Sequence, residues 1–479
     1  MALPQAKDMS HSLDPARIRS LEGFGKTASS DSYLFSPISV DDVKAVFELA
    51  RQQNRKVTLR GAGKSYGDLN IANEALALSL SRMNQILSWD RETGVIVAQA
   101  GATIEDIWRT TLQDGWWPAV VSGTMKPTLG GALAANIHGK NSFKEGTLGE
   151  HVQEIEVVFP TGEAESLTPD DARLYAIISG VGLLGVITKV TLQMNRVYSG
   201  DLRVVPVSCR NLEEQFNAFE SFESDADYRV TWIDCFAKGK SIGRGLFHAA
   251  FYGQSSEPST LREDHQDLPD TILGFIPKSI TWRILRKFNS NFGMRLLNSV
   301  KYRSSKLMGD GKQYRQSLVG FSFLLDYVPN WQNAYLPGGL IQYQCFGPKE
   351  RARQVFEKLL QMQHETGIIS YLGVMKRHRP DRFLFSHGVD GYSLALDFKA
   401  SSRNWTKLRN LCRQMNQVVL KADGRFYFAK DSTLEAADVQ HFLGEVAISE
   451  FRKLKAEVDP DGLLTNTLAE RVGLILPSK

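Results

Sequence analysis

Cysteine is scarce in this chain of 479 residues, and its spacing excludes two classes of protein. The four cysteines, Cys209, Cys235, Cys345 and Cys412, are far apart and form no Cys-x-x-Cys pair, which argues against a disulfide framework and a structural zinc site. The nine histidines include no His-x-x-x-His pair, so a metal site has no support. We therefore expect reduced thiols and a cytoplasmic protein.

Long apolar runs are also absent. No segment is apolar for long enough to cross a bilayer, and the first residues lack the apolar stretch of a signal peptide. We therefore expect a protein that is not integral to a membrane. The net charge of +4 is too small to argue for a nucleic-acid partner by itself. The length and the ordinary composition predict a globular protein of two or three domains.

Helix and strand signals alternate over the first two hundred residues. Ser39 and Thr103 begin capping boxes that predict helices, and Thr168 is expected to cap a third helix with Pro169 at its first position. From about residue 198 to 420 strand signals dominate. This order predicts an α+β fold whose second part is an antiparallel sheet with helices on one side. The strands are expected at 56–60, 76–80, 95–98, 154–159, 186–194, 228–236, 340–345 and 392–398.

One tract is strongly basic. Ten Lys and Arg residues lie between Lys278 and Arg315, against the single acid Asp310. The pattern predicts one amphipathic helix, which either packs on its own domain or rests on an anionic membrane surface. Apolar residues recur at helical spacing among these bases: Ile280, Ile284, Leu285, Phe288 and Phe292.

A glycine-rich stretch at 121–141 is the most informative local feature. Gly130 and Gly131 allow a ligand to approach the main chain, and the alanine-rich run after them predicts a helix whose N-terminal amides would favour a phosphate. The stretch ends in His138-Gly-Lys-Asn141, which places an imidazole and a cation nearby. A tight turn before a buried helix is the alternative interpretation.

Three short motifs imitate other nucleotide or hydrolase sites. The G-x-G-x-x-G pattern at 180–185 follows a predicted helix and precedes a strand, which is the reverse of a dinucleotide fold. A P-loop ending at Ser65 would need glycine where Thr58 stands. Residues 63–67 also fit the G-x-S-x-G elbow of serine hydrolases, but 68–73 lack the helical pattern that should follow, so that class stays only as a rival.

Taken together, residues 60–68, 123–141 and 180–185 resemble the three FAD-contacting segments of the vanillyl-alcohol oxidase superfamily. Segments 331–344, 425–431 and 458–460 further resemble its decaprenylphosphoryl-β-D-ribose 2'-oxidase family. This resemblance implies a two-part PCMH-type FAD-binding domain formed by 1–197 and 424–479, with a substrate-binding domain at 198–423. Many members link the flavin covalently to a histidine where this chain has Lys64, which implies non-covalent FAD.

The resemblance also implies the site residues. Lys430 would supply a base or a positive charge beside flavin and substrate, and His138 and Lys140 would orient the substrate hydroxyl or its phosphate. Gln342 and Gln344 alternate along a strand and share one face. The catalytic candidates are Lys430, His138, Lys140, Gln344 and Tyr66. The FAD-binding candidates are Arg60, Gly61, Ala62, Gly63, Lys64, Ser65, Tyr66, Gly67, Gly123, Thr124, Thr128, Gly130, Gly131, Ala135, His138, Gly139, Asn141, Gly182, Gly185, Ile187 and Tyr427. The substrate-binding candidates are Gln342, Gln344, Ser393, Ala395 and Lys430.

The implied activity is FAD-dependent oxidation of a sugar hydroxyl, with C2 of a polyprenyl-phosphate-linked ribose as the leading substrate. It would form the oxidative half of a two-step epimerisation of a cell-wall precursor, with a short-chain NAD(P)H reductase as partner and a peripheral contact at the inner face of the membrane. Ala395 replaces the pocket cysteine of the family, and Ser142 and Phe143 replace two histidines, which leaves the exact substrate open. The alternatives are a soluble aldonolactone or alditol oxidase and a flavin-free binding protein.

Overall fold

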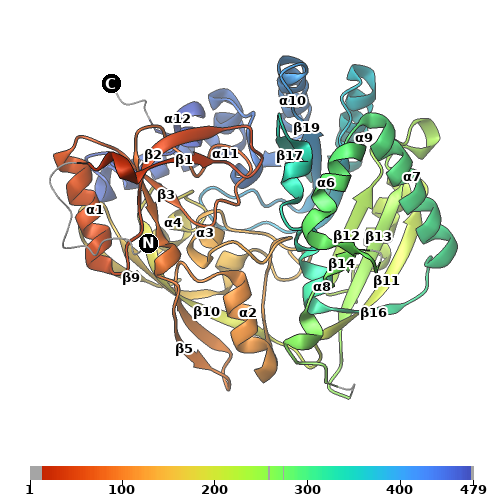
Figure 1. Cartoon of the computed structure of the whole chain (residues 1–479), viewed down its shortest axis with the longest axis horizontal. Coiled ribbons are helices and arrows are strands. Elements are labelled where there is room, and N and C mark those ends of the chain that lie inside the picture. The colour runs from red at the N-terminus through yellow and green to blue at the C-terminus, as the bar shows by residue number, and fades with distance from the viewer. Residues whose placement is uncertain (1–12, 257–258, 273, 476–479) are drawn as a thin grey trace.

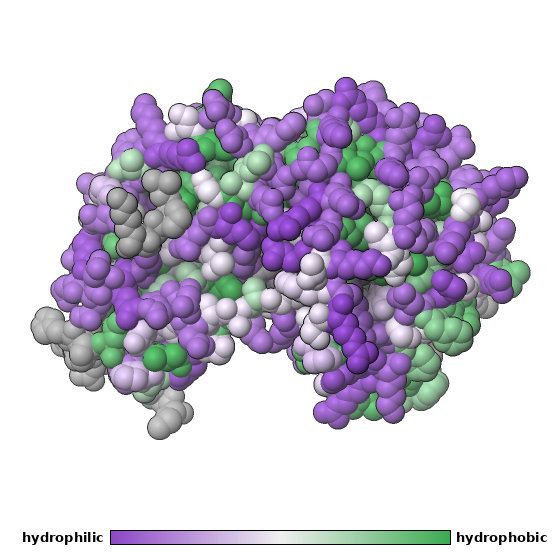
Figure 2. Space-filling view, turned by 90° about the horizontal axis from the view of Figure 1, so that it is seen from above, coloured by the Kyte–Doolittle hydropathy of each residue, from purple (hydrophilic) through white to green (hydrophobic). Residues whose placement is uncertain are grey.

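Four β-sheets organise the chain in the computed structural model, which describes residues 13–256, 259–272 and 274–475. The N-terminal elements and the last two helices lie together in one half of the molecule, and a large sheet with its helices forms the other half (Figure 1). Seen from above, a mostly hydrophilic surface covers both halves, and a hollow separates them along one edge (Figure 2). The mixed α+β class agrees with the prediction.

The first sheet is mixed and has the strand order β1-β2-β4-β3. Helix α1 begins where predicted, and the Ser39 hydroxyl caps it by accepting a hydrogen bond from the Asp42 amide. The predicted capping box is incomplete, because the Asp42 carboxylate accepts the amide of Ile38 and not that of Ser39. Strands β2, β4 and β3 run parallel, so the connections between them cross the sheet. The elements are β1 (Ile18–Glu22), β2 (Ser29–Phe35), α1 (Val40–Gln52), β3 (Val57–Arg60) and β4 (Leu76–Ser79).

The second sheet is antiparallel and is centred on the long strand β10. Helix α2 begins with a complete capping box between Thr103 and Asp106, as predicted. The elements are β5 (Ile86–Asp90), β6 (Val95–Gln99), α2 (Ile104–Thr111), β7 (Trp116–Pro118), α3 (Leu129–Ala134), β8 (Val152–Val158), β9 (Ala164–Leu167), α4 (Ala172–Ile177) and β10 (Val186–Arg196). Because α4 precedes residues 180–185 and β10 follows them, the glycine pattern there lacks the order of a dinucleotide fold.

An eight-stranded antiparallel sheet forms the other half, with the order β16-β11-β13-β12-β18-β19-β17-β20. Its strands are β11 (Asp201–Cys209), β12 (Tyr228–Ile233), β13 (Gly245–Tyr252), β16 (Tyr314–Ser317), β17 (Leu340–Pro348), β18 (Leu372–His378), β19 (Gly391–Lys399) and β20 (Arg425–Phe426). The helices of this part are α5 (Leu212–Ser221), α6 (Lys278–Phe288), α7 (Asn291–Met308), α8 (Leu318–Ser322), α9 (Lys349–Thr366) and α10 (Trp405–Leu420), and a short hairpin joins β14 (Thr271–Ile272) to β15 (Ile276–Pro277).

The C-terminal segment returns to the N-terminal half. It contains α11 (Ala436–Val458), which kinks at Gly444, and α12 (Thr467–Arg471). The Val57 amide donates to Leu463, and the Thr465 amide donates to the Val57 carbonyl. The Arg471 guanidinium forms ion pairs of 2.8 Å with both Asp68 and Asp431. The last helix therefore holds the loop after β3 against the segment that follows β20.

Two predicted helices differ from the structure. The third helix does not begin at Thr168, because the side chain of Asp171 accepts the Arg173 amide and caps α4 at Ala172. The basic tract does not form one helix but two, since α6 ends at Phe288 and Ser290 caps α7.

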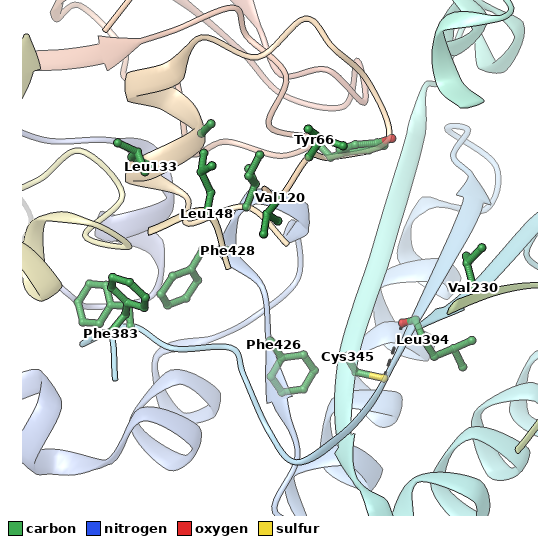
Figure 3. Close-up of a cluster of buried hydrophobic side chains, with 14 of the residues drawn as sticks. Tyr66, Val120, Leu133, Leu148, Val230, Cys345, Phe383, Leu394, Phe426 and Phe428 are labelled. Carbon is green, nitrogen blue, oxygen red and sulfur yellow. Dashed lines mark hydrogen bonds between the residues drawn. The ribbon is translucent and has the colours of Figure 1, made fainter. Parts of the chain in front are cut away.

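The hydrophobic core is continuous across both halves. It runs from Leu133 of α3 and the nearby Leu148, through Phe426 and Phe428 at the return of the chain, to Leu394 in the large sheet (Figure 3). The Cys345 thiol donates weakly to the Leu394 carbonyl at this end. The apolar packing that joins the halves surrounds the cavity described next. Within the described ranges, no helix has the length and apolar character needed to span a membrane.

Candidate active site

A cavity of about 760 Å³ lies where the two halves meet, a size typical of a site for a small molecule or cofactor. Its walls come from loops of the N-terminal half at 60–66, 122–138 and 181–187, and from one face of the eight-stranded sheet. Period-two alternation makes the lining residues of neighbouring strands adjacent: Val230 pairs with Lys376, and Lys376 pairs with Ser393. The cavity is therefore bounded by turns on one side and by a regular sheet face on the other.

The loop after β3 forms a cradle of free backbone amides. None of the N–H groups of residues 62–65 donates a hydrogen bond to another described residue, and all four residues line the cavity. Gly63 has a φ of 64°, a left-handed conformation that favours glycine and directs successive amides toward one side. Such a turn binds anionic oxygens, so residues 62–65 are the part of the cavity best suited to a phosphate.

The predicted anion site at the start of α3 is different. The helix forms at Leu129, but the amides of Leu129 and Gly130 donate to the carbonyls of Ala102 and Ala100, and the amide of Gly131 donates to the Thr128 hydroxyl. A Cβ at Gly130 would lie 2.9 Å from the Ala100 Cβ, so this glycine is needed for close packing between chain segments. The expectation of free amides at the start of α3 was wrong, although the stretch does line the cavity.

Lys430 lines the cavity, and the buried carboxylate of Asp397 lies near it behind the lining. Lys430 lies in the short helix Phe428–Lys430 directly after β20, and its ammonium is 3.8 Å from the centre of the Tyr66 ring. Burial lowers the pKa of Lys430 to about 7, and the nearby carboxylate of Asp397 opposes this shift. Burial likewise raises the pKa of Asp397 to about 6. Both groups can therefore exchange protons near neutral pH, which suits general acid–base catalysis.

Hydrogen bonds fix this pair from both sides. The Gln342 amide donates to Asp397 at 2.5 Å, and the second Asp397 oxygen is buried without a partner among the described residues. The Tyr66 amide donates to the carbonyl of Ala429 at 2.9 Å, beside Lys430. A main-chain hydrogen bond therefore connects the residue after the amide cradle to the residue before Lys430.

His138 lies in a buried cluster of rings. Its Nε2 is 2.9 Å from the amide nitrogen of Gln344, and the rings of His378, His387 and Tyr427 lie 5.0–5.3 Å away. Burial, together with nearby cationic groups, lowers the pKa of His138 well below its usual value. The imidazole is therefore neutral at physiological pH and can orient a hydroxyl by hydrogen bonding. Across the described residues, no three potential ligands meet as a metal site would require.

Two further lysines face the cavity near His138. The Lys140 ammonium is buried and donates to the Phe321 carbonyl. Lys376 on β18 also lines the cavity, and burial lowers its pKa to about 8. Burial also lowers the pKa of Lys140 well below its usual value. With Lys430, these side chains bring three amines to the cavity, and each would gain a proton beside a bound phosphate or a developing anion and stabilise it.

Most predicted site residues line the cavity, and three do not. Gly67 packs so closely on Asp431 that a Cβ would lie 2.0 Å from its carbonyl oxygen. The Gly139 amide donates to Ser142, and the Asn141 side chain donates to the Ala119 carbonyl. These three residues shape the wall from behind. The lining members are Arg60, Gly61, Ala62, Gly63, Lys64, Ser65, Tyr66, Gly123, Thr124, Thr128, Gly130, Gly131, Ala135, His138, Lys140, Gly182, Gly185, Ile187, Gln342, Gln344, Ser393, Ala395, Tyr427 and Lys430.

The sequence interpretation missed several residues at the site. Asp397 shares a strand face with Ser393 and Ala395, and this period-two spacing was available as a signal. Trp232, His248 and Lys376 lie on strands whose pairing the sequence does not reveal. Ser65 follows a strand, but residues 66–73 contain no helix, so the nucleophile elbow of a serine hydrolase is absent here.

Comparison with known proteins identifies the cofactor. Residues 32–168 match the FAD binding domain family, and they include the amide cradle. The chain is an FAD-dependent oxidoreductase. It is 29% identical over 472 residues to decaprenylphosphoryl-beta-D-ribose oxidase of Mycolicibacterium smegmatis, covering 96% of this chain and 99% of the relative. It is 22% identical over 458 residues to bovine L-gulonolactone oxidase, covering 91% of this chain and 94% of that protein. A D-lactate dehydrogenase of Anaerostipes hadrus is 31% identical over 170 residues, which cover 34% of this chain and 36% of that protein.

The cavity fits FAD by its own chemistry. The free amides of 62–65 suit the phosphates. Three residues that line the cavity, Asn70, His138 and Ser322, each have a buried polar atom without a partner among the described residues. A ligand with phosphates and hydroxyls offers donors and acceptors to the polar groups of this lining. The two-part FAD-binding domain of the fold prediction agrees with these observations.

Proposed function

We propose that this protein oxidises a secondary hydroxyl of a sugar to a ketone, and that the sugar is a ribose on a polyprenyl phosphate, oxidised at C2. The observation that supports the proposal is that three kinds of surface line one cavity. These are the amide cradle at 62–65, the surface at Lys430, and an apolar wall at Trp232. The buried carboxylate of Asp397 lies behind this lining, near Lys430. FAD, when bound, supplies the acceptor for the hydride of the carbinol carbon.

The apolar wall favours a substrate with a lipid chain. Trp232 pairs with Leu246 on one neighbouring strand and with Val374 on the other, and Leu372 extends the same face. The Lys301 ammonium lies 4.3 Å from the centre of the Trp232 ring at the far end of this wall. A free sugar has no group that would bury such a surface, whereas the first isoprene units of a polyprenyl phosphate would.

Different polar residues would accept the proton, orient the hydroxyl and bind the phosphate. Lys430, with its lowered pKa, would accept the hydroxyl proton, and Asp397 would stabilise the resulting ammonium. Neutral His138 and its neighbour Gln344 would orient the hydroxyl. Lys140 and Lys376 would attract the phosphate of the substrate to the sheet side of the cavity. These roles are part of the proposal.

The ketone would then need a second enzyme. Reduction from the opposite face by an NAD(P)H-dependent reductase would return an inverted hydroxyl, and the two steps together would epimerise the sugar. The relative from Mycolicibacterium smegmatis, which carries the name of a decaprenylphosphoryl-ribose oxidase, spans 96% of this chain. The proposal therefore extends the activity in that name to this chain and adds a reductase partner.

A soluble aldonolactone or alditol oxidase is the second candidate. It is favoured by the similarity to L-gulonolactone oxidase over 91% of this chain. On this alternative the apolar wall would face no part of the substrate, and the lysines at its edge would have no phosphate to bind.

Flavin bleaching without oxygen distinguishes the two candidates. The purified protein with FAD would be mixed anaerobically with farnesyl-phosphoryl-β-D-ribose, with L-gulono-1,4-lactone or with ribitol, and the visible flavin absorbance followed. We expect bleaching by the phosphoryl ribose only. Farnesyl phosphate without the sugar is the control and should leave the absorbance unchanged. Bleaching by the lactone or ribitol, with none by the phosphoryl ribose, would contradict the proposal.

A further inference from the structure

Helices α6 and α7 expose two rows of large apolar side chains. Ile280, Ile284 and Phe288 lie four residues apart on α6 and are 40%, 36% and 52% exposed. On α7 the same spacing places Phe292, Leu296 and Val300 on one face, and they are 81%, 54% and 55% exposed. Most soluble proteins bury such rows, so a face of this kind indicates a contact that forms outside the single chain. We call these six residues the apolar rows.

The exposed row of α7 is not the face that packs on the protein. The opposite side of the helix holds Asn298, which is buried and donates to Asp234, and Tyr302, which is buried beside Trp232 and Leu246. The helix is thus anchored on one side and apolar on the other. In Figure 2, hydrophobic side chains gather at the lower right edge, on the side of the molecule where Figure 1 shows α7.

The segment that carries the apolar rows bears charge of one sign. Residues 275–308 contain eight Lys and Arg residues and no Asp or Glu. Arg286, Lys287 and Arg303 are exposed beside the rows. A second copy of the chain would bring the same cations face to face, which costs energy through repulsion. An anionic lipid surface offers both an apolar layer for the rows and negative headgroups for the bases.

We propose that the apolar rows of α6 and α7 dock this protein onto an anionic lipid bilayer. The same helix that carries one row also borders the cavity, because Lys301 and Ser305 line it together with Tyr314 and Gln316 of β16. A polyprenyl chain could thus pass from the bilayer along α7 to the wall at Trp232. The docking itself is independent of the reaction, and only this route for the substrate rests on the proposed function.

Sedimentation with vesicles tests the docking. The protein with FAD would be mixed with vesicles of phosphatidylcholine alone or of phosphatidylcholine with one third phosphatidylglycerol. We expect binding to the anionic vesicles and little to the neutral ones. The triple variant Phe292→Ser, Leu296→Ser, Val300→Ser should bind at least about tenfold more weakly, because it loses the apolar face and keeps every charge. Val446→Ser is the matched control, since Val446 is 82% exposed on α11, outside the apolar rows.

Two further measurements separate the possible outcomes. Flavin absorbance checks that each variant is folded, and Phe292→Asp provides a single substitution with the same expected loss of binding. Equal binding of the triple variant and the unchanged protein would overturn the proposal. A dimer in light scattering that the triple variant converts to a monomer would assign the rows to a second copy instead, and would also overturn it. If the variants behave as expected but farnesyl-phosphoryl-ribose bleaches no flavin, the proposed function fails while the docking stands.

Discussion

Substitution of Lys430 can separate a base from a fixed positive charge. Burial lowers the pKa of Lys430 to about 7, so its neutral amine is well populated near neutral pH, whereas an ordinary lysine is almost entirely protonated there. Lys430→Arg keeps the charge but cannot accept a proton at this pH. Lys430→Met removes both. If Lys430 is the base, each variant should slow flavin reduction by about 100-fold or more, the usual contribution of a general base.

The assay is anaerobic bleaching by substrate, measured between pH 6 and pH 9. Because the base must lose its proton first, the rate in the unchanged protein should rise with pH up to about 7 and then level off. Both variants should lose this dependence and keep FAD, because the amide cradle at 62–65 does not use the lysine side chain. A Lys430→Arg protein with the original rate and pH profile would refute the role as a base and leave a purely electrostatic one.

Three other predictions concern the neighbours of this group and the cofactor. Asp397→Asn should move the pH profile to lower pH, since the carboxylate raises the pKa of Lys430; an unchanged profile would show that the two groups do not interact. Gly63→Ala should weaken FAD binding, because a φ of 64° strains residues other than glycine by about 1–2 kcal/mol. Gly162→Ala is the control, since Gly162 has a φ of 93° and no atom near its Cβ. This variant should retain FAD normally in gel filtration. Acid precipitation should leave FAD in the supernatant, because no histidine stands at Lys64 for a covalent link; a yellow pellet would contradict this.

Local sequence signals predicted the helices well where the capping group lies within a few residues of the helix start. The hydroxyls of Ser39 and Thr103 each accept the amide three residues further on, and both helices begin where predicted. At Thr168 two caps were available, and Asp171 supplies the one that forms. The break between α6 and α7 has a local cap at Ser290, which the helical spacing of the apolar residues did not indicate. The buried Asn289 side chain also donates to the Ala334 carbonyl at this break, and the sequence does not reveal that contact.

The same contrast between local signals and distant contacts applies to the residues of the candidate site. Segments that resemble a known family predicted Lys430, His138 and Gln344, and these residues line the cavity. Lys376 was missed because its position beside Ser393 depends on strand pairing between distant segments. The amides at the start of α3 were mistaken for free donors, since the carbonyls that accept them come from residues 100 and 102. Sequence indicates which groups exist, and only the fold determines which of them remain unpaired.

The hydrogen bond from the Tyr66 amide to the Ala429 carbonyl restricts which parts of this enzyme can change during evolution. It is made by main-chain atoms only, so no side-chain replacement at either position removes it, proline at Tyr66 excepted. Substitutions of side chains therefore leave the distance between the amide cradle and Lys430 unchanged. The opposite face of the sheet is lined by side chains such as Ala395, and these can be replaced. New substrates can arise there while the distance between cofactor and lysine stays the same.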